Sequence, residues 1–199
     1  MKHLLKTILF LLLCLPLYGQ DSLLTYPKTL GIEYFGELAF HPGVRIDLGI
    51  PIWTNTKLKG KKNRTFLQQL LLRPKIGYYV LPKYTNNFFV GTDLSLNFRT
   101  TNKKKRKYLF FESFIGLGYL RYSYIGTIYE STASGGFAER KFGGGNSSIV
   151  STGFLIGGSL PAKKLEWILG IEYFLELSED KLIIQHPTAR FGVRAKLEK

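Results

Sequence analysis

The sequence has very little cysteine and methionine, and it lacks a long hydrophobic run. Its 199 residues include one Cys, Cys14, and one Met, Met1. A single cysteine excludes a disulfide scaffold and a metal site built from a cysteine cluster. No segment after residue 20 reaches the 18 or more consecutive apolar residues of a helical membrane span. Helical periodicity is nearly absent, whereas a period of two dominates from Thr29 onward.

The first 20 residues differ from the rest of the chain. Lys2 and Lys6 give a basic start, residues 8–17 form an apolar core, and small and polar residues follow. This order is typical of a secretory signal peptide, and the core is too short to span a bilayer as a helix. A lipoprotein signal that uses Cys14 is the alternative. We expect residues 1–20 to be a signal peptide and residues 21–199 to form one exported domain without cysteine, which excludes a thiol enzyme.

The alternation predicts eight strands in the exported part. They are Thr29–Phe40, Gly43–Trp53, Phe66–Leu81, Asn87–Thr100, Lys107–Tyr124, Ser148–Leu160, Lys164–Leu177 and Thr188–Glu198. Most exceed the ~5–6 residues of an ordinary globular strand and match the ~9–11 residues of a tilted membrane strand. The first hairpin resembles the last, because Leu30–Leu38 recurs as Leu169–Leu177 with eight of nine residues identical. Duplication and convergence both explain this repeat, and both predict that the two hairpins point to the same side.

Each predicted strand has a charged face and an apolar face, since alternate residues of a strand point to opposite sides of a sheet. The charged face holds eight acids and seven bases, interleaved with glycines. These charged residues are Glu33, Glu37, Arg45, Asp47, Arg73, Lys75, Asp93, Arg99, Glu112, Glu166, Glu172, Glu176, Arg190, Arg194 and Lys196. Arg121 is the one charge on the apolar face.

The order of these charges predicts a closed barrel. Signs alternate between neighbouring strands if the last strand pairs with the first, so that opposite charges meet across the seam. The expected contacts are Glu172 and Glu176 with Arg190 and Arg194, and these with Glu33 and Glu37. An eight-stranded barrel has a narrow interior, which suits charges mixed with glycine better than the bulky apolar face. We therefore expect a transmembrane barrel with a charged, side-chain-filled interior and an apolar wall toward lipid; the alternative is a soluble periplasmic lipocalin-like barrel.

The connections on the terminal side of the barrel are strongly basic. They hold 12 basic residues and no acid, while the exported part has a net charge of +12. This basic rim consists of Lys57, Lys59, Lys61, Lys62, Arg64, Lys103, Lys104, Lys105, Arg106, Lys107, Lys163 and Lys164. It suits anionic lipid headgroups, an acidic periplasmic partner or cell-wall polymer, or it serves simply as a solvated anchor. Nucleic acid is not an expected partner, because no recognition motif accompanies the lysines.

Two tryptophans, Trp53 and Trp167, fall at the terminal edge and predict an interfacial aromatic girdle. The longest connection, Ile125–Ser147, lies on the far side and is rich in glycine and serine, which predicts a mobile loop. Both termini are therefore expected in the periplasm, because the longer loops of such barrels are extracellular.

Little in the sequence indicates catalysis. His41 and His186 are expected at the outer rim near Glu179, Asp180 and several serines, where a hydrolase or acyltransferase is conceivable. However, His-Pro at a strand tip is more often turn chemistry, and neither histidine has a serine at a diagnostic spacing. No pair of histidines has the spacing of metal ligands, and nothing indicates a cofactor. We expect no catalytic residue, no metal and no small-molecule cofactor.

Over Thr29–Glu198 the chain resembles the small single-domain β-barrel proteins of the outer membrane of Gram-negative bacteria. The resemblance rests on alternation, charged interior and turn pattern, so it implies an architecture and not an activity. Members of that superfamily usually end on an aromatic residue, whereas this chain ends Ala195–Lys199, and Phe191 is the nearest substitute. The resemblance implies an outer-membrane protein in contact with lipids and with other outer-membrane or periplasmic proteins. A structural or accessory subunit, a lipid-modifying acyltransferase or deacylase, and a narrow pore are the three functional hypotheses.

Overall fold

The computed structural model describes residues 28–37, 42–59, 64–102, 107–131, 135–140, 143–160, 164–178 and 183–197. They form ten strands: β1 (Lys28–Glu37), β2 (Gly43–Lys59), β3 (Arg64–Leu81), β4 (Thr85–Asn102), β5 (Lys107–Tyr124), β6 (Ile128–Ser131), β7 (Phe137–Arg140), β8 (Gly144–Ser159), β9 (Leu165–Ser178) and β10 (Ile183–Leu197). The signal peptide predicted at residues 1–20 lies outside these residues. The described part of the chain contains no helix that is long and apolar enough to cross a membrane.

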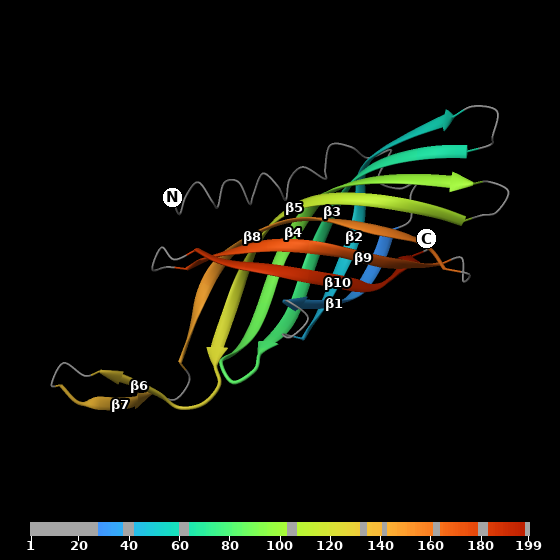
Figure 1. Cartoon of the computed structure of the whole chain (residues 1–199). Helices are drawn as coiled ribbons and strands as arrows, with labels where there is room; N and C mark the ends of the chain where they lie inside the picture. The colour runs from blue at the N-terminus through green and yellow to red at the C-terminus, as the bar shows by residue number, and fades with distance from the viewer. Residues whose placement is uncertain are drawn as a thin grey trace.

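Eight strands close into one barrel, in the order β1-β10-β9-β8-β5-β4-β3-β2 (Figure 1). All neighbours in this ring are antiparallel, and the ring closes where β10 pairs with β1 over ten residue pairs, from Lys28 with Leu197 to Glu37 with Thr188. The predicted eight-stranded antiparallel barrel, closed between its first and last strands, is therefore confirmed.

Because polar and apolar residues alternate in the sequence, the barrel wall has an apolar outer face and a charged inner face. Ile32 is 53% exposed and points outward, while its neighbour Glu33 is completely buried in the interior. On β2, Ile46 is 43% exposed between Arg45 and Asp47, which are each 1% exposed. Neighbouring residues of a strand face opposite sides, so this contrast repeats along the strands. The prediction of a charged, side-chain-filled interior is confirmed.

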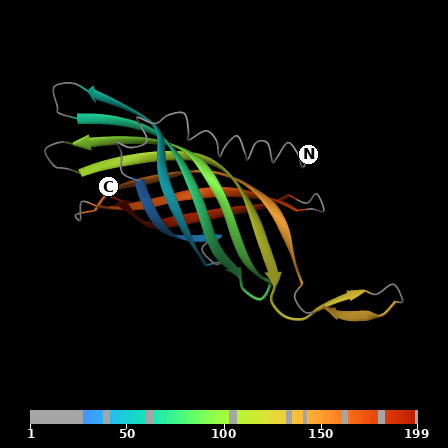
Figure 2. The ribbon, with the colours of Figure 1, turned by 180° about the vertical axis from the view of Figure 1, so that it is seen from behind.

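The barrel is uneven at the end that holds both described termini. Within the described residues, β2 beyond Pro51 pairs with β3 alone, because the described part of β1 begins at Lys28 and pairs with β2 no further than Gly49. The four strands β2–β5 therefore run past the ends of β1 and β10, as Figures 1 and 2 show. The predicted connection at residues 54–65 is wrong in its bounds, since β2 continues to Lys59 and β3 begins at Arg64.

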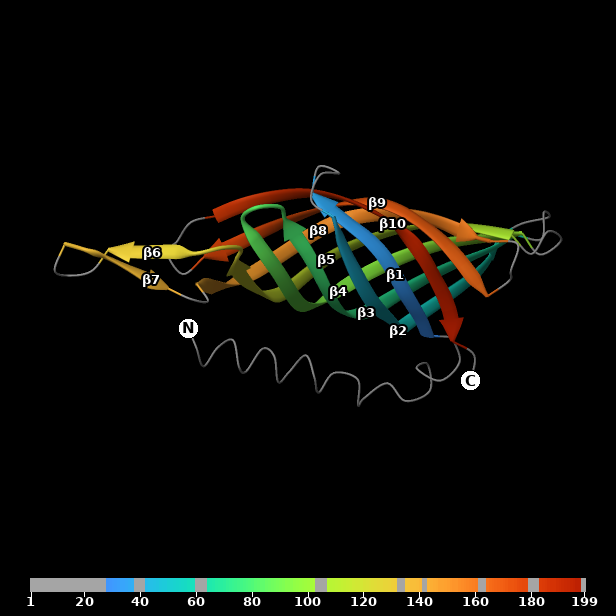
Figure 3. The ribbon, with the colours of Figure 1, turned by 90° about the horizontal axis from the view of Figure 1, so that it is seen from below.

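The longest connection carries structure of its own. The mobile loop expected over Ile125–Ser147 instead contains the short hairpin of β6 and β7, which stands away from the barrel at the end opposite the C-terminus (Figure 3). Gly126 directs the chain into this hairpin with a φ of 105°, a conformation that favours glycine. An added Cβ at Gly126 would meet nothing within 4 Å, so backbone conformation and not space accounts for the glycine.

Candidate functional site: the charged interior

The middle of the barrel is filled by a network of ion pairs from seven strands. Its acids are Glu33, Asp47, Asp93, Glu112 and Glu172, and its bases are Arg45, Arg73, Lys75, Arg190 and Arg194. All ten side chains are at most 4% exposed. Buried charges are stable only when they are paired and hydrogen-bonded, and the equal numbers of acids and bases here allow each charge a partner.

Glu172 and Glu33 are the two centres of this network on the side of β9, β10 and β1. Glu172 accepts contacts from Arg45 at 2.7 Å and from Lys75 and Arg190 at 3.2 Å. Glu33 accepts a 2.7 Å hydrogen bond from Nε of Arg190, and its other oxygen lies 3.1 Å from Nη2 of Arg194. Each carboxylate therefore serves more than one cation, and each cation links strands that are far apart in the sequence.

A second group of contacts crosses toward β2–β5. Glu112 on β5 accepts hydrogen bonds from Arg73 at 3.0 Å and from Arg194 at 3.1 Å. Arg73 also bonds Asp47 at 2.8 Å, and Lys75 bonds Asp93 at 2.5 Å. Such fully desolvated, multiply bonded charges hold the opposite walls of the barrel at a fixed separation.

Glycine makes room for the carboxylates. A Cβ added at Gly116 on β5 would lie 1.9 Å from Oδ1 of Asp93 on the neighbouring strand and 2.6 Å from Oγ of Ser151. The carboxylate thus occupies the space that a side chain would take. This close approach explains why small residues alternate with long ones on the inward face.

A smaller polar cluster lies at the terminal end of the interior. Glu166 accepts a 2.5 Å hydrogen bond from the Tyr108 hydroxyl and lies 3.1 Å from Arg99 and 3.8 Å from Lys196. The guanidinium of Arg99 and the ammonium of Lys196 both lie over the Tyr108 ring, at 4.4 and 4.3 Å from its centroid. Arg99 and Lys196 are more exposed than the bases of the central network, which is expected of charges near the open end.

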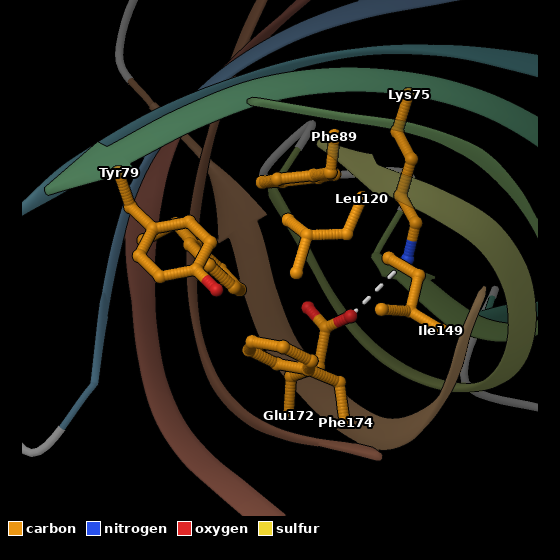
Figure 4. Close-up of a pocket in the computed structure, with 8 residues that line it drawn as sticks. Lys75, Tyr79, Phe89, Leu120, Ile149, Glu172 and Phe174 are labelled. Atoms are coloured by element: carbon orange, nitrogen blue, oxygen red, sulfur yellow. Dashed lines mark hydrogen bonds and ion pairs between the residues drawn. The ribbon is translucent and has the colours of Figure 1, made fainter. Parts of the chain in front are cut away.

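An apolar plug fills the interior on the other side of the network. It consists of Phe35, Tyr79, Phe89, Leu120, Ile149 and Phe174, all at most 5% exposed. Figure 4 shows the small cavity where this plug meets the Lys75–Glu172 ion pair. Its volume of about 10 Å³ is at the lower limit for one water molecule.

Beyond the plug lies a second polar cluster that contains the one described histidine. Glu176 accepts a 2.6 Å hydrogen bond from Ser147 Oγ, and its other oxygen lies 3.3 Å from Nε2 of His186. His186 also stacks on Phe174, with 4.3 Å between the ring centroids. The serine proton is directed at the carboxylate, whereas a nucleophilic relay needs it directed at the histidine. All three side chains are buried inside the barrel, not exposed at its rim.

Several predicted site residues lie elsewhere than expected or outside the description. Glu176 pairs with His186 rather than with the expected arginine, because Arg194 is opposite Glu166 in the β9–β10 register. The side chain of Glu37 and the residues His41, Glu179 and Asp180 lie outside the described part. The structure describes no side chain of the basic rim except that of Lys164, which is exposed.

The two girdle tryptophans both point outward. Trp167 does so by the alternation of β9, and Trp53 does so because a β-bulge shifts the β2–β3 register between Pro51 and Trp53. By strict alternation Trp53 would follow the inward face of Asp47 and Pro51. The bulge turns it outward, where it is 46% exposed.

Sequence reasoning missed the apolar plug and the uncharged polar members of the interior. Ser151 and Asn97 complete the network, donating to Asp93 and Glu112 or accepting from Lys75. The inward parity that identified the charges also places Phe35, Phe89 and Phe174 inside, so tracking all residues on that face would have found the plug. Among the described residues, no group of three acids, histidines or cysteines is suited to a metal ion.

The comparisons with known proteins give matches among solved structures. No family model and no curated protein sequence matches the chain. The fold is similar to that of Neisserial surface protein A, with a TM-score of 0.43 and 13% identity over 85% of this chain and 94% of that chain. It is also similar to Ail, the attachment invasion locus protein of Yersinia pestis, solved with the heparin analogue sucrose octasulfate. That match has a TM-score of 0.29 and 9% identity over 84% and 96% of the two chains. Both are small eight-stranded outer-membrane β-barrel proteins.

Proposed function

We propose that the chain is an integral outer-membrane β-barrel protein with a closed interior and a non-enzymatic role, as a structural component or accessory subunit of an outer-membrane assembly. The inversion of polarity across its wall carries this proposal. Ile115 and Ile171 are 59% and 53% exposed on the outside, while Arg194 and Glu112 are completely buried inside. In water this arrangement would be unfavourable on both faces, whereas lipid outside the barrel makes the outer face favourable.

The height of the apolar wall supports the same conclusion. Along β5 the exposed apolar side chains extend from Leu109 to Tyr119. Ten residues of strand cover about 34 Å, which becomes about 26 Å along the barrel axis at the usual tilt near 40°. That height matches the apolar band of about 25 Å that outer-membrane barrels present to lipid.

A closed interior favours a structural role over a pore. The charged network and the apolar plug follow each other along the barrel axis, so that a solute would have to cross both. The cavity between them has a volume of about 10 Å³, which leaves no room for a column of water. We therefore expect no conductance above background when the protein is inserted in a planar bilayer.

We place both termini and the basic rim in the periplasm. The terminal-side strand ends, Lys59 with Arg64 and Asn102 with Lys107, lead into short connections, while the β6–β7 hairpin extends from the opposite end. Long connections of such barrels are normally extracellular. The rim then faces anionic headgroups of the inner leaflet or an acidic periplasmic partner, which is the contact expected of an accessory subunit.

Membrane fractionation followed by a heat-modifiability gel tests the proposal. The protein should be in the outer-membrane fraction and should migrate differently before and after boiling, because a closed barrel resists detergent. Ile115→Arg should impair membrane assembly, since a lipid-facing arginine near the bilayer centre costs about 2–4 kcal/mol. The matched control Ile115→Leu should assemble normally. A protein in the soluble periplasmic fraction would overturn the proposal.

Two further measurements test the finer parts of the role. His186→Ala and Ser147→Ala should leave the lipid profile of the outer membrane unchanged, and a changed acylation pattern would favour a lipid-modifying enzyme instead. Co-purification after mild solubilisation should recover a stoichiometric membrane or periplasmic protein if the chain is an accessory subunit. If the barrel is recovered alone, it is not an accessory subunit, and the role as a structural component remains.

A further inference from the structure

Three outward-facing polar pairs join neighbouring strands near the far end of the barrel. The Tyr78 hydroxyl donates to Asn86 at 2.8 Å between β3 and β4. Arg121 Nη1 donates to Asn146 Oδ1 at 3.0 Å between β5 and β8. The Tyr173 hydroxyl bonds Gln185 between β9 and β10. Tyrosine and amide groups that point outward just beyond an apolar wall are typical of a membrane–water boundary. These pairs therefore mark the outer boundary of the apolar wall.

One of the three pairs contains a charge, and that charge is unusual in its setting. Arg121 is the residue that breaks the separation of charged and apolar faces in the sequence, and the structure shows it exposed on the outward face. Its strand neighbours are Phe88 on β4 and Asn146 on β8. Phe88 is 46% exposed, and Tyr119, two residues earlier on the same face, is 47% exposed. Arg121 thus has apolar surface below it and an amide beside it.

Among the residues that the structure describes, the contacts of Arg121 include no carboxylate. The barrel-strand acids whose side chains the structure describes point into the interior, on the other side of the wall. Within the described residues, Arg121 forms no ion pair, and its hydrogen bond to Asn146 occupies one of the five N–H donors of the guanidinium. A guanidinium at a lipid boundary, with donors left over and no carboxylate, is suited to a phosphate group, which it can bind with two parallel hydrogen bonds.

We propose that Arg121, with Asn146 and Phe88, forms a binding site for the phosphate headgroup of an anionic lipid in the outer leaflet. Arg121 binds the phosphate, Asn146 holds the guanidinium in place, and Phe88 contacts the first segment of the acyl chain. This inference rests on the proposed membrane location and adds a lipid class and a site to it. It also explains why Arg121, an outward charge of β5, lies at the boundary and not within the apolar band.

The test uses the full barrel in lipid nanodiscs of phosphatidylcholine with increasing fractions of phosphatidic acid, whose phosphate is unshielded. NMR shifts of the Phe88, Arg121 and Asn146 backbone amides report on the site itself, separately from the basic rim at the other end. These three signals should titrate together at a low fraction of phosphatidic acid. Arg121→Gln should raise the midpoint for Phe88 and Asn146 roughly tenfold, because a charge-assisted hydrogen bond is lost. Arg121→Lys should give an intermediate value.

Lys28→Gln is the matched control, since Lys28 is an exposed cation at the terminal end of β1. It should leave the midpoint at the Arg121 site unchanged. Inorganic phosphate at millimolar concentration should not shift the three signals, because the acyl contact with Phe88 is then missing. Equal midpoints for Arg121→Gln and the unaltered protein would overturn the inference, and so would a response to inorganic phosphate equal to that to the lipid.

The same sample separates this inference from the membrane location itself. If Ile115 and Ile171 show contacts with lipid acyl chains while the three site signals do not respond to phosphatidic acid, the barrel spans the membrane and only the phosphate site is wrong. If the protein does not enter nanodiscs and remains soluble without lipid, the proposed location fails first.

Discussion

The charged network in the middle of the barrel and the apolar plug beside it are filled by opposite kinds of chemistry. In the middle, Glu172 and its neighbours form a network in which each charged group bonds several others. Toward the far end, Phe35, Phe89 and Phe174 pack with centroid distances of 5.3 and 5.7 Å and without directional bonds. Both regions are equally buried. The stability of the network depends on the positions of individual atoms, whereas the stability of the plug depends on how well its side chains fill the available volume.

The difference teaches where the barrel is sensitive. Removing one member of the network leaves several buried charges with fewer partners, so that part of their desolvation is uncompensated. Removing a plug side chain leaves a cavity whose cost depends on how far the neighbours can relax. We therefore expect truncation of a network side chain to lower the free energy of unfolding more than truncation of a plug side chain of similar size.

The largest effect is expected from Glu172→Ala. This change leaves Arg45, Lys75 and Arg190 with one acceptor fewer in the buried network. The free energy of unfolding should fall by about 3–5 kcal/mol, as it does when one partner of a buried ion pair is removed. Urea unfolding in lipid vesicles, followed by tryptophan fluorescence, measures it. Glu172→Gln, which keeps the shape and one acceptor, should lose less; a loss below that of the plug variants would contradict the comparison.

A smaller loss is expected from Leu120→Ala in the plug. Leu120 is 1% exposed and packs in the apolar cluster, so its truncation removes buried apolar surface and leaves a cavity. The free energy of unfolding should fall by about 2–3 kcal/mol, measured by the same unfolding experiment. Bilayer conductance should stay at background, because the charged network still closes the interior. New conductance in this variant would show that the plug alone closes the barrel.

Tyr108→Phe tests the comparison at the terminal end of the barrel, where the Tyr108 ring lies beside the ion pairs of Glu166. The change keeps the ring under Arg99 and Lys196 but removes the hydroxyl that bonds Glu166 at 2.5 Å. Because a hydrogen bond to a charged group is lost, the free energy of unfolding should fall by about 1.5 kcal/mol. An unchanged midpoint of urea unfolding would mean that Glu166 is satisfied by its two cations alone.

The smallest effect is expected outside the interior. Tyr34 and Phe191 stack across the β1–β10 seam on the outward side of the barrel wall, with 4.7 Å between centroids. Tyr34→Ala should cost about 0.5–1 kcal/mol in unfolding free energy, since in the proposed membrane location lipid replaces the lost contact and no charge is exposed. A cost as large as that of Leu120→Ala would show that the seam, and not the interior, limits the stability of the barrel.

Much of the fold follows from patterns that are local in the sequence. Alternation of Ile32, Glu33 and Tyr34 specifies which side of the wall each residue faces, whatever its strand neighbours are. Trp53 shows the limit of that argument, because a single bulge reverses the parity of everything that follows it in β2. The paired segments of β6 and β7 were also missed, since their four residue pairs are too few for a period to show.

The sequence by itself determined the faces of the strands, the charge balance of the interior and the closure of the first strand on the last. These properties follow from parity and from the requirement that buried charges have partners. The sequence also predicted that Arg190 meets Glu172 and Glu33 at the seam, but only the tertiary structure decided which charges meet across the lumen. Arg45 reaches Glu172, which is 127 residues away, and Glu176 turns to His186 instead of an arginine. Contacts across the lumen depend on the tilt and stagger of the whole barrel, and no single strand encodes these quantities.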